Sequence, residues 1–174
     1  MPAVRAWRAP VAIAIAVIAL DQLTKHWAVT SLGTDREIDL FWTLRLNLAF
    51  NNGMAFGQGQ GFGPVIAVIA TVVIVYLLVS LQTEASPMGT IGMGLLIGGA
   101  AGNLIDRLFR GDDGFLQGGV VDFIDLQWFP IFNIADIAIN VGAALLILNS
   151  ILAARAHRHD DSTDPVADDA GSPT

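Results

Sequence analysis

The chain has 174 residues, of which 53% are hydrophobic and only 14% are charged, with a mean hydropathy of +0.59. This balance excludes an ordinary water-soluble domain, which needs a charged outer surface, and it favours a small multi-span membrane protein. The sequence has no cysteine, which excludes disulfides, thiolate nucleophiles and cysteine-ligated metals. The nine Lys and Arg residues do not cluster, so nothing in the sequence suggests binding to nucleic acid.

Four segments are long and apolar enough to cross the hydrocarbon core of a bilayer, which takes about 20 residues of helix. They are residues 7–29, 64–81, 88–109 and 131–154. Arg5 and Arg8 before the first apolar run also fit a cleaved signal peptide. That run leads into Asp21 and Lys25 without a small-residue cleavage site, which favours an uncleaved helix. We therefore expect an all-α membrane protein with four transmembrane helices.

Two longer connections, residues 31–63 and 110–130, lie on one side of this arrangement. Residues 38–46 partly alternate in polarity and Asn51-Asn52-Gly53 follows, which predicts a small extracytoplasmic β-element on the membrane surface. Three tryptophans near the same boundary, at positions 27, 42 and 128, suit an interfacial belt.

The ends of the chain carry the orientation signal. Arg5, Arg8, Arg155 and Arg158 flank the first and last spans, which predicts that both termini are cytoplasmic and that the two long connections are outside. Four arginines in or near those connections, at positions 36, 45, 107 and 110, oppose this rule. Residues 158–174 hold five of the sixteen acidic residues and no aromatic residue, so we expect a disordered acidic tail.

Polar residues at membrane depth need a partner or a function. Asp21 and Lys25 are four residues apart on one helical face and can pair. Two further polar faces are expected at similar depth: Asn103, Asp106 and Arg107 on the third helix, and Asn133, Asp136 and Asn140 on the fourth. Gly94, Gly98 and Gly102 form a row at which a neighbouring helix can approach closely. We expect a buried polar cluster at the outer end of the bundle.

Carboxylates are the catalytic groups that remain for this cluster. The sequence has only three histidines, which disfavours a serine triad, and no His-Glu-x-x-His motif for zinc. Two aspartates that share a proton can activate water and polarise a carbonyl without metal or other cofactor. Asp136, in an otherwise apolar helix, is the first candidate. Spacing alone leaves Asp122 and Asp106 as rivals for the second place. We interpret Asp106 as a partner of Arg107, and Asp125 as solvated.

The chain resembles the lipoprotein signal peptidases (signal peptidase II) over roughly residues 21–142. Each motif alone is weak, but five occur in order: Asp21-Gln22-Leu23-Thr24-Lys25, Asn52-Gly53-Met54-Ala55-Phe56-Gly57, Gly102-Asn103-Leu104-Ile105-Asp106-Arg107, Val120-Val121-Asp122-Phe123-Ile124-Asp125 and Phe132-Asn133-Ile134-Ala135-Asp136.

The resemblance implies an aspartic endopeptidase of the bacterial cytoplasmic membrane, with its active site near the outer face and no cofactor. It would cleave lipid-modified prolipoproteins just before the diacylglyceryl cysteine. The implied catalytic pair is Asp122 and Asp136. The implied residues that bind substrate or support the pair are Asn52, Asn103, Arg107 and Asn133, with Asp21, Lys25, Asp106 and Asn140 in the same cluster.

The chain departs from the family in the longer Gly- and Asp-rich stretch between Arg110 and Val120, and in its acidic tail. Two other classes of function stay open from the residues alone. A small transporter or proton channel would use the buried carboxylates as a relay, although no inverted repeat is visible. A non-enzymatic assembly subunit would use the glycine row to pack against a partner.

Overall fold

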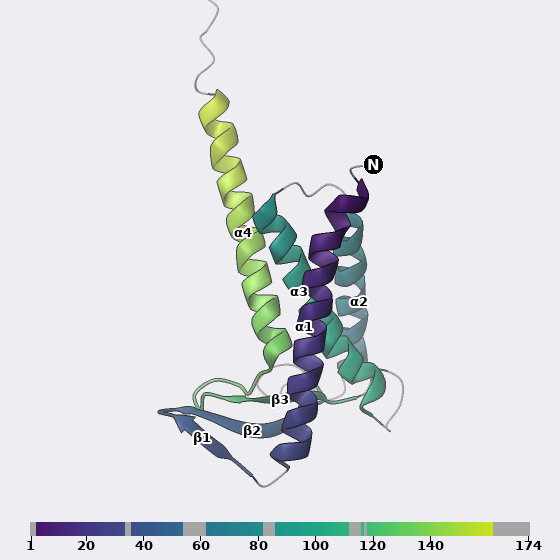
Figure 1. The fold of residues 1–174 in the computed structure, drawn as a ribbon, viewed down its shortest axis with the longest axis vertical. Coiled ribbons are helices and arrows are strands. Elements are labelled where there is room, and N and C mark those ends of the chain that lie inside the picture. Colours follow the sequence, from purple (N-terminus) through teal and green to yellow (C-terminus); the bar gives the residue numbers. More distant parts are fainter. Residues whose placement is uncertain are drawn as a thin grey trace, which may run out of the picture.

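The computed structural model describes residues 3–33, 36–53, 62–81, 86–111, 116 and 118–161. In chain order the elements are α1 (Ala3–Ser31), β1 (Ile38–Phe41), β2 (Leu44–Asn51), α2 (Gly63–Ser80), α3 (Pro87–Phe109), β3 (Val120–Asp125) and α4 (Ile134–Asp161). The helices run alongside one another, and an antiparallel sheet of order β1-β2-β3 lies at one end of the bundle (Figure 1). The start of α1 and the end of α4 lie at the opposite end (Figure 1).

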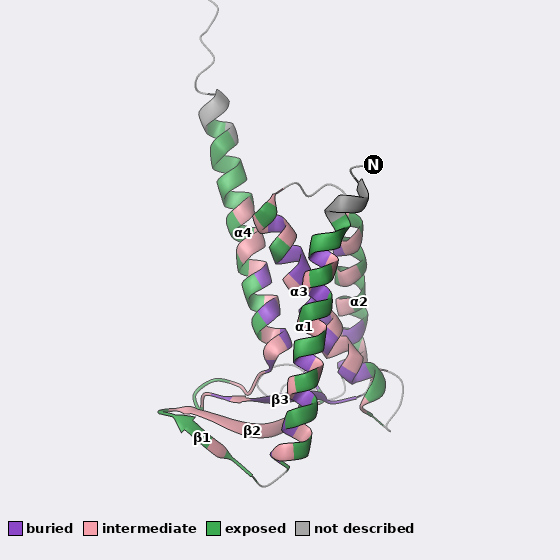
Figure 2. Cartoon of the chain, in the orientation of Figure 1, coloured by how far each residue is buried: buried purple, intermediate pink, exposed green. Residues whose placement is uncertain are grey.

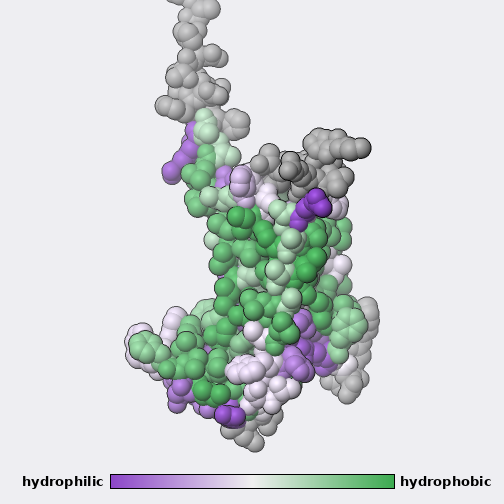
Figure 3. All heavy atoms as spheres, in the orientation of Figure 1, coloured by the Kyte–Doolittle hydropathy of each residue, from purple (hydrophilic) through white to green (hydrophobic). Residues whose placement is uncertain are grey.

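The four predicted spans are confirmed. The described part of the chain has four helices long and apolar enough to cross a membrane: Trp7–Ser31, Gly63–Ser80, Pro87–Phe109 and Ile134–Ala156. Many residues on the outward faces of the helices are exposed (Figure 2). On the face that Figure 3 shows, apolar residues cover the side of the bundle and polar ones gather toward its ends. The fourth helix continues to Asp161, so residues 158–161 of the predicted acidic tail are helical. The rest of that tail lies outside the described residues.

Glycines on two faces of α3 bring α1 and α4 close to its backbone. The predicted row Gly94, Gly98 and Gly102 faces α1: a Cβ at Gly98 would lie 2.7 Å from Cβ of Val17 and 2.9 Å from the carbonyl oxygen of Ala14. A second pair, Gly92 and Gly99, faces α4, and a Cβ at Gly99 would lie 2.5 Å from the carbonyl oxygen of Ala135. Because α3 touches both helices at backbone distance, side chains on all three can meet at one end.

The small β-element differs in detail from the prediction. Residues 38–46 form parts of two antiparallel strands, with the turn at Trp42, whose φ of 51° is left-handed. Asn51 ends β2, and its side-chain oxygen accepts from the backbone N–H of Gly53 at 3.1 Å, so the chain turns at Asn51-Asn52-Gly53. A third strand comes from the second long connection: β3 pairs antiparallel with β2, and Ala49 is opposite Asp122. Alternating polarity predicted the strand character, but the pairing of distant segments needed the fold.

An apolar cluster fixes this sheet to the end of the bundle. Ala28 and Leu32, at the end of α1, pack with Val121 and Phe123 of β3, and all four side chains are buried. Since residues 121 and 123 point to α1 and alternate residues of a strand point to opposite faces, Asp122 points the other way. The sheet therefore places Asp122 beside the ends of α3 and α4.

We expect Gly98→Ala to destabilise the fold. Its Cβ has no room against the α1 backbone, so α1 and α3 must separate, which by analogy with overpacked cores costs about 1–3 kcal/mol. Thermal unfolding in detergent, followed by tryptophan fluorescence, measures the change. Val68→Ile also adds one carbon, at a side chain of α2 that is 55% exposed, and is expected to leave the midpoint unchanged. Equal midpoints for the two variants would contradict the close helix contact.

Candidate active site

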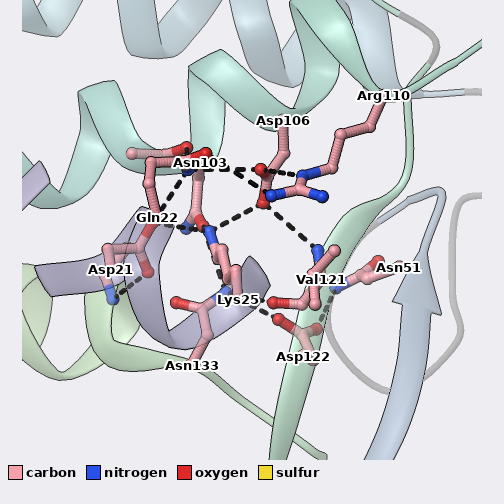
Figure 4. Close-up of polar contacts among 12 residues, drawn as sticks. Asp21, Gln22, Lys25, Asn51, Asn103, Asp106, Arg110, Val121, Asp122 and Asn133 are labelled. Carbon is pink, nitrogen blue, oxygen red and sulfur yellow. Dashed lines mark hydrogen bonds and ion pairs between the residues drawn. The ribbon is translucent and has the colours of Figure 1, made fainter. Parts of the chain in front are cut away.

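A buried lysine lies at the centre of the polar cluster. Lys25 Nζ lies 2.8 Å from Asp21 Oδ2 on its own helix and 2.8 Å from Asp106 Oδ2 on α3, and the side chains of all three are fully buried. Nζ also donates a hydrogen bond of 2.9 Å to Asn103 Oδ1. Figure 4 shows these side chains converging between α1 and α3. The predicted Asp21–Lys25 pair is confirmed, and Asp106 of α3 is a second carboxylate partner of Lys25.

The expected Asp106–Arg107 pair is wrong. Asp106 pairs with Lys25 and with Arg110, one turn further along α3. Arg107 instead donates from Nη2 to the carbonyl oxygen of Gly53 at 3.2 Å. Successive residues on a helix point about 100° apart, so neighbours in the sequence do not face each other.

Asn133 caps α4 and positions Asp136. Its Oδ1 accepts from the backbone N–H of Asp136 at 3.0 Å, and its own backbone N–H donates to Asp136 Oδ2 at 3.2 Å. This reciprocal pair is a capping box, in which an aspartate takes the place of the usual Glu or Gln. Asn103 Nδ2 donates to the other oxygen, Oδ1, at 2.9 Å. Asp136 therefore stays half-buried at the first turn of α4 with both oxygens hydrogen-bonded.

The same Asn133 also holds Asp122. Its Nδ2 donates to Asp122 Oδ1 at 2.7 Å, and Asn51 at the end of β2 donates to Asp122 Oδ2 at 3.3 Å. One asparagine thus binds both carboxyl groups, through its side chain to Asp122 and through its backbone to Asp136. The structure brings the two aspartates of the predicted pair together around Asn133. Asp106, the other candidate for the second place, forms ion pairs with Lys25 and Arg110.

Burial changes the acidity of Asp122, which is 3% exposed. Desolvation, together with the nearby charge of Asp136, raises the pKa of Asp122 from 3.8 to about 7. Hydrogen bonds from Asn133 and Asn51, and the charge of Lys25, act in the opposite direction and are smaller. Asp122 is therefore suited to hold a proton near neutral pH.

A cavity of about 1070 Å³ opens beside the two aspartates. Its polar side is formed by Asp122 and Asp136 with Asn103 and Arg107. Its other walls are largely apolar and come from β2, α2, α4 and the segment after β3, with Ile66, Trp128, Phe129, Ile131, Phe132, Ile137 and Val141 among them. Of the remaining predicted site residues, Asn52 and Asn140 line this cavity as well. Asn140 is exposed and donates to the carbonyl oxygen of Asp136.

The prediction that Asp125 is solvated is wrong. Asp125 is 4% exposed and accepts from Arg45 Nε at 2.7 Å, from Asn47 Nδ2 at 3.3 Å and from the backbone N–H of Gln127 at 2.6 Å. These hydrogen bonds hold the pKa of Asp125 below its ordinary value, although its burial acts the other way. Arg45 is opposite Asp125 across the β2–β3 pair, a neighbour that sequence spacing does not show.

Three residues of the polar network around the site were not singled out from the sequence. Gln22 Nε2 donates to Asp106 Oδ1 at 3.2 Å and to the carbonyl oxygen of Gly102 at 3.1 Å. Arg110 pairs with Asp106, and Asn51 binds Asp122. Two of them could have been found from the sequence. Gln22 lies inside the first motif, and Arg110 is four residues, about one helical turn, after Asp106. Met54–Gly57 of the second motif, and residues 112–115 and 117 of the longer loop, lie outside the described residues.

The fold and site define a multi-span membrane protein whose polar side chains gather around two aspartates at one end of four helices. Residues 13–152 match the family model described as signal peptidase (SPase) II. The chain belongs to the signal peptidase II family of bacterial membrane peptidases, and it is a protease and a multi-pass membrane protein.

Relatives and solved structures agree with this family. The chain is 39% identical over 148 residues to the lipoprotein signal peptidase of Mycobacterium avium (strain 104), covering 84% of this chain and 81% of the relative. It is 38% identical to that of Mycobacterium tuberculosis (strain ATCC 25618 / H37Rv), over 84% and 73% of the two chains. A bacterial membrane enzyme solved by the in meso method at 2.3 Å matches with a TM-score of 0.73 and 27% identity, over 93% of this chain and 94% of that chain.

Asp122 and Asp125, three residues apart on β3, are expected to give different pH signatures of stability. A carboxyl whose pKa is raised on folding stabilises the fold fully below about pH 4, and this stabilisation is lost as the pH rises through about 7. The melting temperature of Asp122→Asn, relative to the unchanged protein, should therefore rise between pH 5 and pH 8.

Asp125→Asn is the matched control. Its stabilisation is present above about pH 4 and lost only as the pH falls through the lowered pKa, so this variant should be less stable by a constant amount between pH 5 and pH 8. Melting curves in detergent at several pH values measure both. A constant difference for Asp122→Asn over this range would show that its carboxyl is not perturbed.

Proposed function

We propose that this chain is an aspartic endopeptidase that removes signal peptides from lipoprotein precursors, with Asp122 and Asp136 as its catalytic pair. The observation that carries the proposal is that one buried residue, Asn133, binds both carboxyl groups at the wall of the cavity. The relatives that the chain matches are lipoprotein signal peptidases, and membership of a peptidase family does not favour a transporter or proton channel.

The two carboxyl groups are proposed to divide the proton transfers of hydrolysis between them. Asp122, whose pKa is raised to about 7, keeps the shared proton, and Asp136 is the base. Asp136 takes a proton from water as the water oxygen attacks the carbonyl carbon, and Asp122 donates its proton to the carbonyl oxygen. When the tetrahedral intermediate collapses, the C–N bond breaks, Asp136 gives its proton to the leaving amine, and Asp122 takes a proton back from a hydroxyl group of the intermediate, which leaves the carboxyl product. Water thus supplies every atom that is added.

The polar groups around the pair suit a peptide backbone. Nη1 of Arg107 is buried with no hydrogen-bond partner among the described residues, so it is available for a substrate carbonyl. Asn52 and Asn103 line the same cavity. We assign substrate binding to these three residues, and we assign to Asn133 the orientation of both carboxyl groups. Asp21, Lys25, Asp106 and Asn140 support the site.

The apolar walls suit the lipid on the precursor. Ile66 of α2 and Val141 of α4 belong to the membrane-spanning helices and line the cavity, so an acyl chain can pass from the bilayer to its wall without crossing water. Cleavage just before a diacylglyceryl cysteine places the peptide at the aspartates and the acyl chains along these helices.

The site is proposed to face the outside of the cytoplasmic membrane. The sheet and the catalytic pair lie at one end of the bundle, while the start of α1 and the end of α4 lie at the other (Figure 1). Arg8 and Arg155 each lie one residue inside the end of the first and last span on that side, which fits cytoplasmic termini.

Asp122→Asn and Asp136→Asn are each expected to lower the cleavage rate of a lipidated precursor by at least about 10²–10⁴-fold, because each removes one proton-transfer group. Purified variants are incubated with the precursor and the product is separated by electrophoresis. Asp125→Asn, on the same strand as Asp122, keeps the pair and is expected to cleave. An Asp136→Asn variant that cleaves at the unchanged rate would remove the basis for the mechanism.

The lipid on the substrate is expected to be required. Removing the two acyl chains leaves the apolar cavity wall without a partner, so the unlipidated precursor should be cleaved at least about 100-fold more slowly at equal concentration. The two forms of one precursor are compared with the same enzyme preparation. Equal rates would show that the enzyme recognises the peptide alone.

A further inference from the structure

Two backbone amides beside the catalytic pair are held by buried carboxylates. The N–H of Val121, directly before Asp122, donates to Asp106 Oδ2 at 3.2 Å. The N–H of Ala135, directly before Asp136, donates to Asp21 Oδ1 at 3.0 Å. The residue that precedes each catalytic aspartate is thus fixed to a different helix, Val121 to α3 and Ala135 to α1.

Lys25 joins these two carboxylates. Its Nζ is 2.8 Å from Asp21 Oδ2 and 2.8 Å from Asp106 Oδ2 (Figure 4). The third contact of Nζ is Asn103 Oδ1 at 2.9 Å, and Asn103 Nδ2 donates to Asp136 Oδ1 at 2.9 Å. An ammonium group has three N–H donors, and here each has an acceptor connected to the catalytic pair.

The surroundings leave little freedom for this arrangement. Lys25, Asp21 and Asp106 are all fully buried. Asp21 Oδ2 lies 2.6 Å from the place where a Cβ of Gly102 would be, so its carboxyl group occupies the space that this glycine leaves open. The two carboxylates cannot move apart without leaving a buried charge unpaired, which proteins avoid.

We propose that Lys25 is a positioning residue that sets the separation of the Asp122 and Asp136 carboxyl groups. The inference rests on the proposed catalytic pair. Lys25 contacts neither carboxyl group directly; it acts through Asp106 on the backbone of β3, and through Asp21 and Asn103 on the start of α4. An arginine does not replace it, because a planar guanidinium fork presents its donors in a different geometry.

A residue that only holds α1 against α3 would give a different result from one that positions the pair. The charged groups around Asp122 are Lys25 from α1, Asp106 and Arg107 from α3 and Asp136 from α4. The charge of Lys25 lowers the pKa of Asp122. Without that charge the pKa of Asp122, the proton donor of the proposed mechanism, rises, so the alkaline limb of the rate profile moves to higher pH. Loss of helix packing alone lowers the amount of folded enzyme and leaves the limb in place.

The test compares Lys25→Met with Arg110→Met in the full-length protein, using a lipidated precursor. Both variants remove a positive charge that pairs with Asp106, but Arg110 holds neither the Ala135 amide, through Asp21, nor Asn103. For Lys25→Met we expect kcat to fall about 100-fold, as for misplacement of reacting groups by about 1 Å. KM should change less than about threefold, and the alkaline limb should move to higher pH. Arg110→Met should keep kcat within about threefold of the unchanged enzyme, the range of a partly exposed ion pair.

If Lys25→Met does not fold, a second pair of variants tests the positioning contact between Asp106 and the Val121 amide. Asp106→Asn keeps an oxygen that accepts from the Val121 amide, whereas Asp106→Leu has none. Per mole of folded enzyme, Asp106→Asn should retain at least about tenfold more activity than Asp106→Leu, since a misplaced pair loses rate steeply. Equal activity in these two variants would overturn the inference, as would a Lys25→Met enzyme with unchanged kcat or an unmoved alkaline limb.

Asp136→Asn is measured in the same series to separate this inference from the proposed function. If Asp136→Asn cleaves at the unchanged rate, the catalytic pair itself is wrong. If Asp136→Asn is inactive and Lys25→Met has unchanged kcat, the pair is retained and only the positioning role fails.

Discussion

Lys25 sits between Asp21 and Asp106 with no exposure to solvent, and this contact constrains much of the molecule. A charge at membrane depth is tolerated only with a partner, so α1 and α3 must meet in the register that pairs these groups. Glycines 94, 98 and 102 make the meeting possible, because a side chain there would keep the helices apart. The paired charges and the glycine row therefore belong to the same interface between α1 and α3.

The remaining polar contacts extend from this interface to the catalytic pair. Asp106 and Asp21 hold the backbone of β3 and of α4, while Asn133 closes the capping box and binds both Asp122 and Asp136. Rigid elements and buried hydrogen bonds therefore set the position of both carboxyl groups, which suits chemistry that depends on a shared proton. The apolar side of the cavity needs no such network, and membrane-facing helices supply it.

Local spacing predicted part of the site correctly. Asp21 and Lys25 pair at the i, i+4 distance, and Asn133 and Asp136 meet across one turn. Where a partner came from another segment, the expectation failed. Asp106 pairs with Lys25 and Arg110 and not with its neighbour Arg107, and Asp125 is bound by Arg45 across a strand pair. The motif resemblance singled out Asp122, whereas spacing alone left it level with Asp106.

The sequence by itself determined the four spans, the polar faces and the small-residue row, because hydrophobic length and helical periodicity are local properties. Only the tertiary structure decided which polar groups pair, that β3 joins β2, and that Asn133 connects the two aspartates. Those contacts join residues up to 114 positions apart, as between Ala135 and Asp21. Periodicity along one helix says which face is polar, but the partner on that face is selected by the packing of the other helices and the sheet.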